Sequence, residues 1–184
     1  MKVGLMMVFQ NFEDTTTDQA AWERDIELAG LAEPLGFDTL SAVEHHFFNY
    51  AMSPDNLQFL SYMAAQTQKI GLLTGAVILP WNDPLRVAER MIVLDHLSQG
   101  RALFGIGRGL ALREYETFGV DMNEARDRFD EAAVRLALVS RSVEGSFDHA
   151  LLAHHEGLLH EAEGRHEDAL EAAHRACDSA AELG

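Results

Sequence analysis

The chain has 184 residues, which is the length of one domain or of a domain with a small appendage. It is 47% hydrophobic and 24% charged, as is typical of globular proteins that bury a core. The formal net charge of −16 argues against nucleic acid or an anionic membrane surface as a partner, because both attract clustered Lys and Arg. Cys177 is the only cysteine, which excludes an intrachain disulfide and an all-cysteine metal site.

The amino-terminal residues lack the long apolar region and the small-residue cleavage site of a signal peptide. The longest apolar stretch, Ile70–Trp81, is too short to cross a bilayer. We therefore expect a soluble protein of the cytoplasm.

Four short apolar runs predict β-strands that begin 31 to 36 residues apart, which is the size of one βα unit: Val3–Val8, Thr39–Val43, Ile70–Val77 and Ala102–Ile106. The runs are apolar on both faces, as in a parallel sheet that is covered on both sides. Four βα units with right-handed crossovers predict an α/β fold, either half of a TIM (β/α)8-type barrel or a small open sheet.

Helix start and stop signals lie between these runs. Asp18 is placed to cap a first helix that stops near Pro34 and Gly36, and Asp55 opens a second helix. Pro84 suits the first turn of a third helix, and Met122 to Val143 predicts a fourth. We expect the third helix to end at Ser98-Gln99-Gly100, with Gly100 as a left-handed cap, and its inner side to carry Val87, Ala88, Met91, Ile92, Leu94 and Leu97.

Residues that do chemistry in parallel βα folds gather on the loops that follow the strands. Three segments have that position, and parallel pairing would put them on one rim: Glu44-His45-His46-Phe47-Phe48, Leu79-Pro80-Trp81-Asn82-Asp83-Pro84 and Gly105-Ile106-Gly107-Arg108-Gly109-Leu110. The His pair beside Glu44 could be half of a metal site, a proton shuttle or a structural cluster, and proton transfer fits imidazole chemistry best. We expect no metal, since the barrel region offers no further suitably spaced ligand.

The glycines around Arg108 could let a ligand approach the backbone, or they could form a tight turn. They match neither a P-loop nor a G-x-G-x-x-G fingerprint. Arg108 itself is suited to hold a phosphate or carboxylate through two parallel hydrogen bonds, or it is an ordinary exposed side chain.

Taken together, six segments in order resemble the luciferase-like, flavin-dependent monooxygenases. They lie between residue 1 and about residue 146: Gly36-Phe37-Asp38-Thr39, Glu44-His45-His46-Phe47, Thr74-Gly75-Ala76-Val77-Ile78-Leu79-Pro80, Leu94-Asp95-His96-Leu97-Ser98-Gln99-Gly100-Arg101, Phe104-Gly105-Ile106-Gly107-Arg108-Gly109-Leu110 and Phe118-Gly119-Val120-Asp121-Met122-Asn123. The resemblance implies the amino-terminal half of a flavin-binding barrel.

The resemblance also implies roles for single residues. His45 would be the catalytic histidine that assists proton transfer at the reactive edge of the flavin. Gly75 and Ala76 would form a non-proline cis peptide beneath the flavin ring. Arg108 and Leu110 would contact the flavin, and Arg126 would reach its phosphate. The implied cofactor is reduced FMN, with a deazaflavin less favoured, and the implied partners are a small organic substrate such as an aldehyde and a flavin reductase.

Beyond Glu144 the composition changes. Residues 144–184 contain ten acidic and two basic residues, so they carry −8 of the net charge, and they hold six of the nine histidines. They show no strand pattern, and Ala150–Glu163 and Glu167–Leu183 predict a helical hairpin with a weak tetratricopeptide-like spacing. We therefore expect a half-barrel over residues 1–146 and an acidic helical hairpin over residues 147–184. His155 and His160 in this segment are five residues apart, not the three or four that place metal ligands on one face of a helix. We therefore expect that His154, His155 and His160 belong to a solvated acidic face and bind no metal.

The family's barrel continues through four more strands, which the pattern after residue 146 does not supply. The expected open edges allow three outcomes: a fragment with unrelated sequence appended, two half-barrels that join as a homo-oligomer, or an open sheet covered by the tail. We favour the first. From the family resemblance we predict a flavin-dependent monooxygenase. The alternatives are a non-catalytic assembly module and an inactive fragment.

Overall fold

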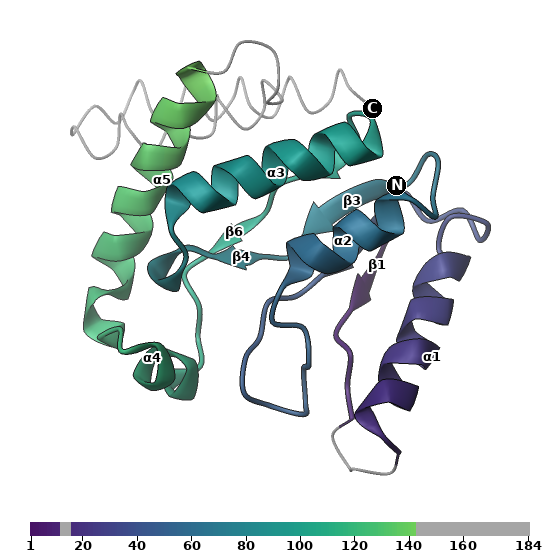
Figure 1. The fold of residues 1–184 in the computed structure, drawn as a ribbon, viewed down its shortest axis with the longest axis horizontal. Helices are drawn as coiled ribbons and strands as arrows, with labels where there is room; N and C mark the ends of the chain where they lie inside the picture. The colour runs from purple at the N-terminus through teal and green to yellow at the C-terminus, as the bar shows by residue number, and fades with distance from the viewer. Residues whose placement is uncertain (12–15, 143–184) are drawn as a thin grey trace.

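The computed structural model describes residues 1–11 and 16–142. Four parallel strands form the main sheet in the order β1-β2-β3-β5, and β4 pairs with β6 in a second, two-stranded parallel sheet. The strands are β1 (Gly4–Met7), β2 (Thr39–Ala42), β3 (Gly71–Thr74), β4 (Val77–Ile78), β5 (Ala102–Leu103) and β6 (Ile106–Gly107). Figure 1 shows the β4–β6 pair on the side of the main sheet that faces α5. The predicted α/β architecture of parallel βα units is therefore confirmed.

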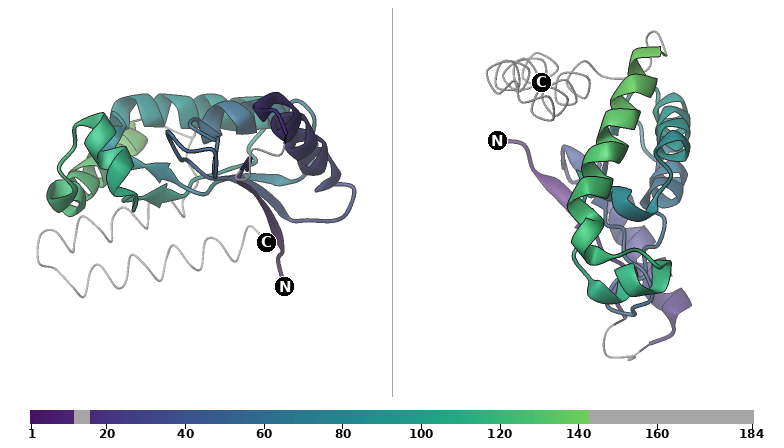
Figure 2. Two further views of the ribbon diagram at one scale, coloured as in Figure 1. Left: turned by 90° about the horizontal axis from the view of Figure 1, so that it is seen from below. Right: turned by 90° about the vertical axis from the view of Figure 1, so that its left-hand side faces the viewer.

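A helix follows β1, β2 and the β3–β4 pair, and two helices follow β6. They are α1 (Asp18–Leu31), α2 (Asn56–Ala64), α3 (Pro84–Ser98), α4 (Leu112–Phe118) and α5 (Ala125–Ser142), with short 3-10 turns at η1 (Leu79–Trp81) and η2 (Met122–Glu124). Figure 2 shows α1, α2 and α3 together on one side of the main sheet. Among the described residues, no helix is long and apolar enough to cross a membrane.

The two faces of the main sheet differ because successive residues of a strand point to opposite sides. One row of register partners packs into the core on the helix side: Leu5, Leu40, Leu72 and Ala102. The neighbouring row points to the other face: Met6, Ser41, Leu73 and Leu103. Met6 is 55% exposed, whereas Leu40 and Leu72 are fully buried. The described part of the chain thus forms a sheet with one face packed by helices and the other partly open.

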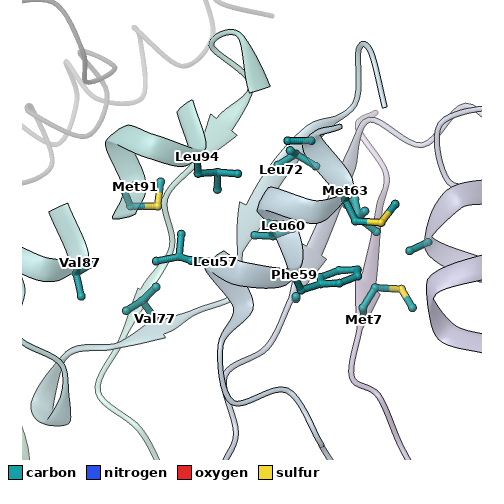
Figure 3. Packing of buried hydrophobic residues seen from close by; sticks show 14 of the residues in the cluster. Met7, Leu57, Phe59, Leu60, Met63, Leu72, Val77, Val87, Met91 and Leu94 are labelled. Carbon is teal, nitrogen blue, oxygen red and sulfur yellow. The ribbon is translucent and has the colours of Figure 1, made fainter. Parts of the chain in front are cut away.

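The core lies between the sheet and helices α2 and α3. Figure 3 shows side chains from both helices, among them Leu60 and Leu94, pointing toward Leu72 and Val77 of the strands. Burying such side chains contributes about 1.5–3 kcal/mol each. A second group, in which Phe9 stacks on Trp22 with ring centroids 3.9 Å apart, closes the core beneath α1.

Two of the predicted strands are each divided into two shorter strands, and the two breaks lie side by side. The run Ile70–Val77 divides into β3 and β4 around the Gly75–Ala76 peptide, which is cis, and the run Ala102–Ile106 divides into β5 and β6. The Thr74 side chain spans the gap: its Oγ1 accepts a hydrogen bond from Gly105 N (2.8 Å) and donates one to Gly105 O (2.9 Å). The Thr74 side chain and one backbone hydrogen bond, from Val77 N to Gly105 O (2.9 Å), therefore connect the two chains where the periodicity predicts continuous strands.

The helix termini follow the predicted signals with one correction. Asp55 caps α2, Pro84 is the first residue of α3, and α3 ends in two left-handed residues, Gln99 (φ 58°) and Gly100 (φ 85°). The prediction that Asp18 caps α1 is wrong, because Thr17 is the cap and accepts a hydrogen bond from Ala20 N. Thr17 has the extended backbone of a cap, and Asp18 is the first helical residue.

Three further predictions about helices need correction. Leu97 was expected on the inner side of α3, but it is 55% exposed, and Ser98 is buried instead. The predicted fourth helix begins as the 3-10 turn η2, and α5 proper starts at Ala125. The helix α4 was not predicted, since seven residues with several charges give no clear periodic signal.

The main sheet has two edges, β1 and β5, as expected for half of a barrel. The exposed leucines Leu28, Leu31 and Leu35 lie beside the β1 edge and line a shallow groove with Met6 and Phe37. The predicted helical hairpin over residues 147–184, with its predicted helices Ala150–Glu163 and Glu167–Leu183, lies outside the described residues.

Two glycines provide a matched test of the contact between the strand breaks. A Cβ atom built at Gly105 would lie 2.2 Å from the Thr74 carbonyl oxygen, whereas one built at Gly30, exposed in the last turn of α1, would meet nothing within 4 Å. We expect Gly105→Ala to lower the free energy of unfolding by about 3 kcal/mol. Gly30→Ala should raise it by about 0.5–1 kcal/mol. Chemical denaturation of both variants measures the difference, and equal stability would contradict the contact.

Glu33, in the loop after α1, accepts hydrogen bonds from the backbone just before β3. Burial raises the pKa of Glu33, but the backbone N–H groups of Ile70, Lys69 and Gln68 and the charge of Arg101 outweigh it and hold the pKa below its usual value. The N–H donors lie 2.7–3.1 Å from the carboxylate oxygens. The ionised Glu33 therefore stabilises the fold above about pH 4.3, the ordinary pKa of a glutamate. This stabilisation is lost as the pH falls through the lowered pKa of Glu33 in the folded protein.

We expect Glu33→Gln to be less stable than the wild type by about 1–2 kcal/mol at neutral pH, because the charge-assisted bonds are lost. The difference should shrink below about pH 4. Urea denaturation from pH 7 to pH 3 tests this, with Glu27→Gln on the exposed side of α1 as the control. A difference that stays constant over this range would contradict the assignment.

Candidate active site

The three segments predicted to share a rim do lie together at the carboxyl ends of the strands. Glu44, directly after β2, accepts hydrogen bonds from Ile78, Trp81 and Asn82 in the segment after β3. A Cβ built at Gly109, in the segment after β6, would lie 2.8 Å from the Trp81 ring. Parallel pairing brings these loops to one end of the sheet, as parallel βα units require.

Glu44 is the buried centre of this cluster, with only 6% of the residue exposed. Its Oε2 accepts from Ile78 N (3.0 Å), and its Oε1 accepts from Trp81 Nε1 (2.8 Å) and Asn82 Nδ2 (2.9 Å). His46 Nε2 lies 3.2 Å from the same Oε1. A buried carboxylate needs such donors to offset the loss of water. Glu44 therefore acts as a structural anchor for the rim.

His45 lies next to Glu44 but points into a different environment. Its Nδ1 is 3.1 Å from Glu114 Oε1, and its Nε2 is 3.3 Å from the Tyr50 hydroxyl. The side chain of His45 is 26% exposed. An imidazole that is partly open to solvent and held at both nitrogens can accept or release a proton, so the geometry is compatible with proton transfer.

The loop that carries His45 is held by the loop after β1. His45 N donates to Ser53 O (3.0 Å), Met52 N donates to Phe9 O (3.0 Å), and Asn11 N donates to Asn49 O (2.8 Å). The buried Ser53 hydroxyl donates to Val43 O at 2.8 Å. These bonds satisfy the backbone groups of an irregular segment and so fix the position of the histidine.

Glu114 is a site residue that the sequence reasoning missed. It lies on α4 and is 1% exposed, and its Oε1 contacts both His45 Nδ1 and His46 N, the latter at 2.7 Å. In the sequence it stands between Arg113 and Tyr115 in a short charged segment, where a glutamate is normally solvated. Only the packing of α4 under the rim shows that this carboxylate is buried.

Gly75 and Ala76 form the cis peptide that the family resemblance implies. Asn56, which is 1% exposed, holds this segment through its Nδ2, which donates to Ala76 O (3.0 Å) and Ala42 O (3.3 Å). Gly107 lies beside it on β6, and a Cβ built there would be 3.3 Å from Ala76 Cβ. The surface at this point consists of backbone and one methyl group, so it could receive a flat ring.

Arg108 and Leu110 are both exposed on the segment after β6, Leu110 by 79%. The Arg108 carbonyl accepts a hydrogen bond from the Tyr115 hydroxyl, which fixes the backbone of this exposed arginine. Burial raises the pKa of Tyr115, so its hydroxyl stays protonated and remains a donor. Arg108 therefore lies one residue beyond the Gly107–Ala76 contact with its charge accessible.

Arg126 lies on a different element, at the start of α5, and α5 packs against η1. Its side chain is 64% exposed, and its Nε donates to Asp130 Oδ2 at 2.9 Å. A phosphate bound by Arg126 would share this guanidinium with Asp130. The structure thus joins His45 to Glu114 and places Gly107 and Arg108 beside Ala76. The roles in flavin binding and catalysis assigned to His45, Arg108, Leu110 and Arg126 all stay predictions.

An aromatic cluster surrounds the histidine pair. Trp81 stacks on Phe118 with ring centroids 5.3 Å apart and meets Tyr115 edge-on at 5.1 Å. The His46 ring meets Phe118 edge-on at 4.8 Å. Phe47, which is 48% exposed, packs on Phe118 as well. The rim therefore offers an apolar aromatic surface next to His45.

Comparison with known proteins identifies the family. The sequence profile of the luciferase-like monooxygenases matches residues 1–176. The chain belongs to the luciferase-like monooxygenase family. The match continues beyond residue 146, and the predicted division of the chain at that residue stays a prediction.

Two curated relatives show the degree of similarity. The chain is 34% identical to the alkanal monooxygenase alpha chain of Photorhabdus luminescens over 127 residues, which is 68% of this chain and 34% of that protein. It is 36% identical to the limonene 1,2-monooxygenase of Rhodococcus erythropolis over 112 residues, which is 61% of this chain and 29% of that protein. The matched part of the chain therefore spans about one third of the length of these relatives.

Solved structures agree with this assignment. The monooxygenase RslO1 of Streptomyces bottropensis matches with a TM-score of 0.69 and 37% identity, over 74% of this chain and 42% of that one. The oxygenating constituent of the Pseudomonas putida 3,6-diketocamphane monooxygenase, solved with FMN, matches with a TM-score of 0.69 over 76% of this chain and 39% of that one. At 21% identity the second likeness concerns the fold alone.

We expect Glu44→Ala to destabilise the protein by about 3 kcal/mol or more, because Ile78 N, Trp81 Nε1 and Asn82 Nδ2 would lose their acceptor. The control is Glu116→Ala on the exposed side of α4, which should change stability by less than about 0.5 kcal/mol. Chemical denaturation measures both. A Glu44→Ala variant as stable as the control would show that the carboxylate does not anchor the rim.

Proposed function

We propose that residues 1–146 supply the amino-terminal half of the active site of a flavin-dependent monooxygenase. The cofactor in this proposal is reduced FMN, and the substrates are O2 and a small organic molecule such as an aldehyde. Free reduced flavin would come from a separate reductase. Membership of the luciferase-like family supports the reaction class, and the assignment of this activity to the chain is our inference.

One observation carries the proposal: three chemically distinct groups lie on the same rim. They are the partly open imidazole of His45, the backbone surface where Gly107 meets Ala76, and the exposed guanidinium of Arg108. An imidazole, a flat apolar surface and a cation correspond to the proton carrier, the ring support and the anion contact that a bound flavin nucleotide needs.

The residues at the rim fit FMN on physical grounds. The built Cβ at Gly107 comes within 3.0 Å of Ile78 Cδ1 and 3.3 Å of Ala76 Cβ, so a side chain there would disturb the surface that a ring would rest on. The chain carries a net charge of −16, which repels a phosphate unless local cations oppose it. Arg108 and Arg126 are exposed cations that could do so.

Reduced flavin, when bound, would supply the oxygen chemistry, and the chain's own residues would orient it and manage protons. His45 would hold or release a proton at Nε2, the ring nitrogen on the Tyr50 side. The aromatic cluster around Trp81 and Phe118 would keep water from the reacting edge. We favour FMN over a deazaflavin because the Arg108-Gly109-Leu110 segment resembles the FMN-using members more closely.

The open β1 edge favours a second candidate, a non-catalytic half-barrel that assembles with another chain. The apolar groove formed by Leu28, Leu31 and Leu35 beside that edge is the observation behind it. This candidate predicts an oligomer with little affinity for flavin.

FMN titration of the purified chain, followed by flavin fluorescence, tests the primary proposal. We expect saturable binding that weakens about tenfold or more in Arg108→Ala, because a charge-assisted phosphate contact contributes about 1.5–3 kcal/mol. His45→Ala should bind FMN but lose oxygenation of aldehydes.

Arg86→Ala is the matched control, since Arg86 is an exposed, ion-paired arginine on α3. It should bind FMN like the wild type. Light scattering run beside the titration gives the mass. An oligomer that does not bind FMN would favour the assembly module, and undiminished oxygenation by His45→Ala would contradict the role of that histidine.

A further inference from the structure

The ring of His45 lies between two side chains from different parts of the fold. Glu114 Oε1 on α4 is 3.1 Å from Nδ1, and the Tyr50 hydroxyl in the loop after β2 is 3.3 Å from Nε2. Glu114 is 1% exposed, whereas Tyr50 is 38% exposed. One ring nitrogen therefore faces a buried carboxylate and the other faces the open side of the rim.

We propose that Glu114 is a positioning residue for His45: it keeps a proton on Nδ1, so that Nε2 is the nitrogen that gains and loses a proton. This inference rests on the proposed function for its catalytic meaning, although the proton arrangement itself can be measured without flavin.

Glu114 has a third partner, the backbone N–H of His46. Oε1 of Glu114 also lies 2.7 Å from His46 N, and a backbone N–H can only donate. As a carboxylate, Glu114 can only accept hydrogen bonds, in keeping with the bond that it receives from His46 N, so the hydrogen in the Nδ1 contact belongs to the imidazole. In the neutral ring Nε2 then carries the lone pair, and the Tyr50 hydroxyl donates to it.

The geometry also separates the two histidines of the pair. His46 directs its Nε2 to Glu44 Oε1 at 3.2 Å, whereas His45 directs its Nδ1 to Glu114. Each imidazole thus has its own buried carboxylate. Arg113, the nearest cation in sequence to Glu114, lies over the Phe48 ring instead, 4.9 Å from its centroid.

This arrangement has a consequence for proton transfer. A proton taken up at Nε2 gives an imidazolium whose charge is balanced by Glu114 on the far side of the ring. Loss of that proton restores the neutral ring with Nδ1 still bonded to the carboxylate. The proton therefore enters and leaves on the Tyr50 side, where the rim is open, and Glu114 exchanges none.

The tautomer can be read directly by ¹⁵N NMR of the full chain labelled at histidine, with both ring nitrogens of His45 followed from pH 6 to pH 10. The signals of His45 are identified by their loss in His45→Asn. We expect Nε2 to become the unprotonated nitrogen as the pH rises while Nδ1 keeps its proton. Deprotonation at Nδ1, or a mixture of tautomers like that of free histidine, would overturn the proposal. This outcome can be seen in the wild-type chain, so it does not depend on how a Glu114 variant folds.

The isosteric variant Glu114→Gln tests the cause. Removing the charge should lower the ratio of the Nδ1–H to the Nε2–H form by about tenfold, because hydrogen bonds to an ionised partner are roughly twice as strong as neutral ones. Glu116→Gln, on the exposed side of the same helix, is the control and should leave the ratio unchanged. An unchanged ratio in Glu114→Gln would overturn the role of Glu114.

The experiments can separate a wrong role for Glu114 from a wrong proposed function. FMN binding tests the cofactor site, and the tautomer of His45 is measured in the protein without FMN. A chain that shows the expected tautomer but binds no FMN would keep the positioning role and lose the monooxygenase proposal.

Discussion

The burial of Glu44 at the end of β2 is the constraint on which the rest of the rim depends. A carboxylate that is only 6% exposed must have donors, and it obtains them from Ile78, Trp81 and Asn82. These bonds draw the segment after β3 against the loop after β2. The position of Trp81 in turn sets the place of α4, because its ring packs on Phe118 and Tyr115.

A second buried carboxylate, Glu114, completes the arrangement from the other side. It reaches the backbone of His46 and the ring of His45, so α4 and the loop after β2 hold one another. The strands below are interrupted at the same level, where Thr74 bonds Gly105. The rim is therefore held by side-chain and backbone hydrogen bonds above a parallel sheet, and these bonds fix the irregular loops that carry the histidines.

The sheet that supports this rim is open at β1 and β5 among the described residues, and Met6, on the face away from the helices, is 55% exposed. The matched part of this chain covers about one third of the length of curated relatives in the luciferase-like family. The first four βα units thus carry the histidine pair, the Gly75–Ala76 peptide and Arg108 within one continuous stretch of sequence. Any group contributed by the rest of a relative would have to be brought to the same rim.

The sequence by itself determined the parallel βα organisation, the family, and the three segments that form the rim. The reason is local: apolar runs, cap residues such as Asp55 and Pro84, and glycines act within a few residues of their own positions. The tertiary structure alone decided the partners of the carboxylates. Glu114 is read from sequence as a solvated residue, and only the packing of α4 buries it beside His45, because burial depends on contacts that are 69 residues apart in the chain.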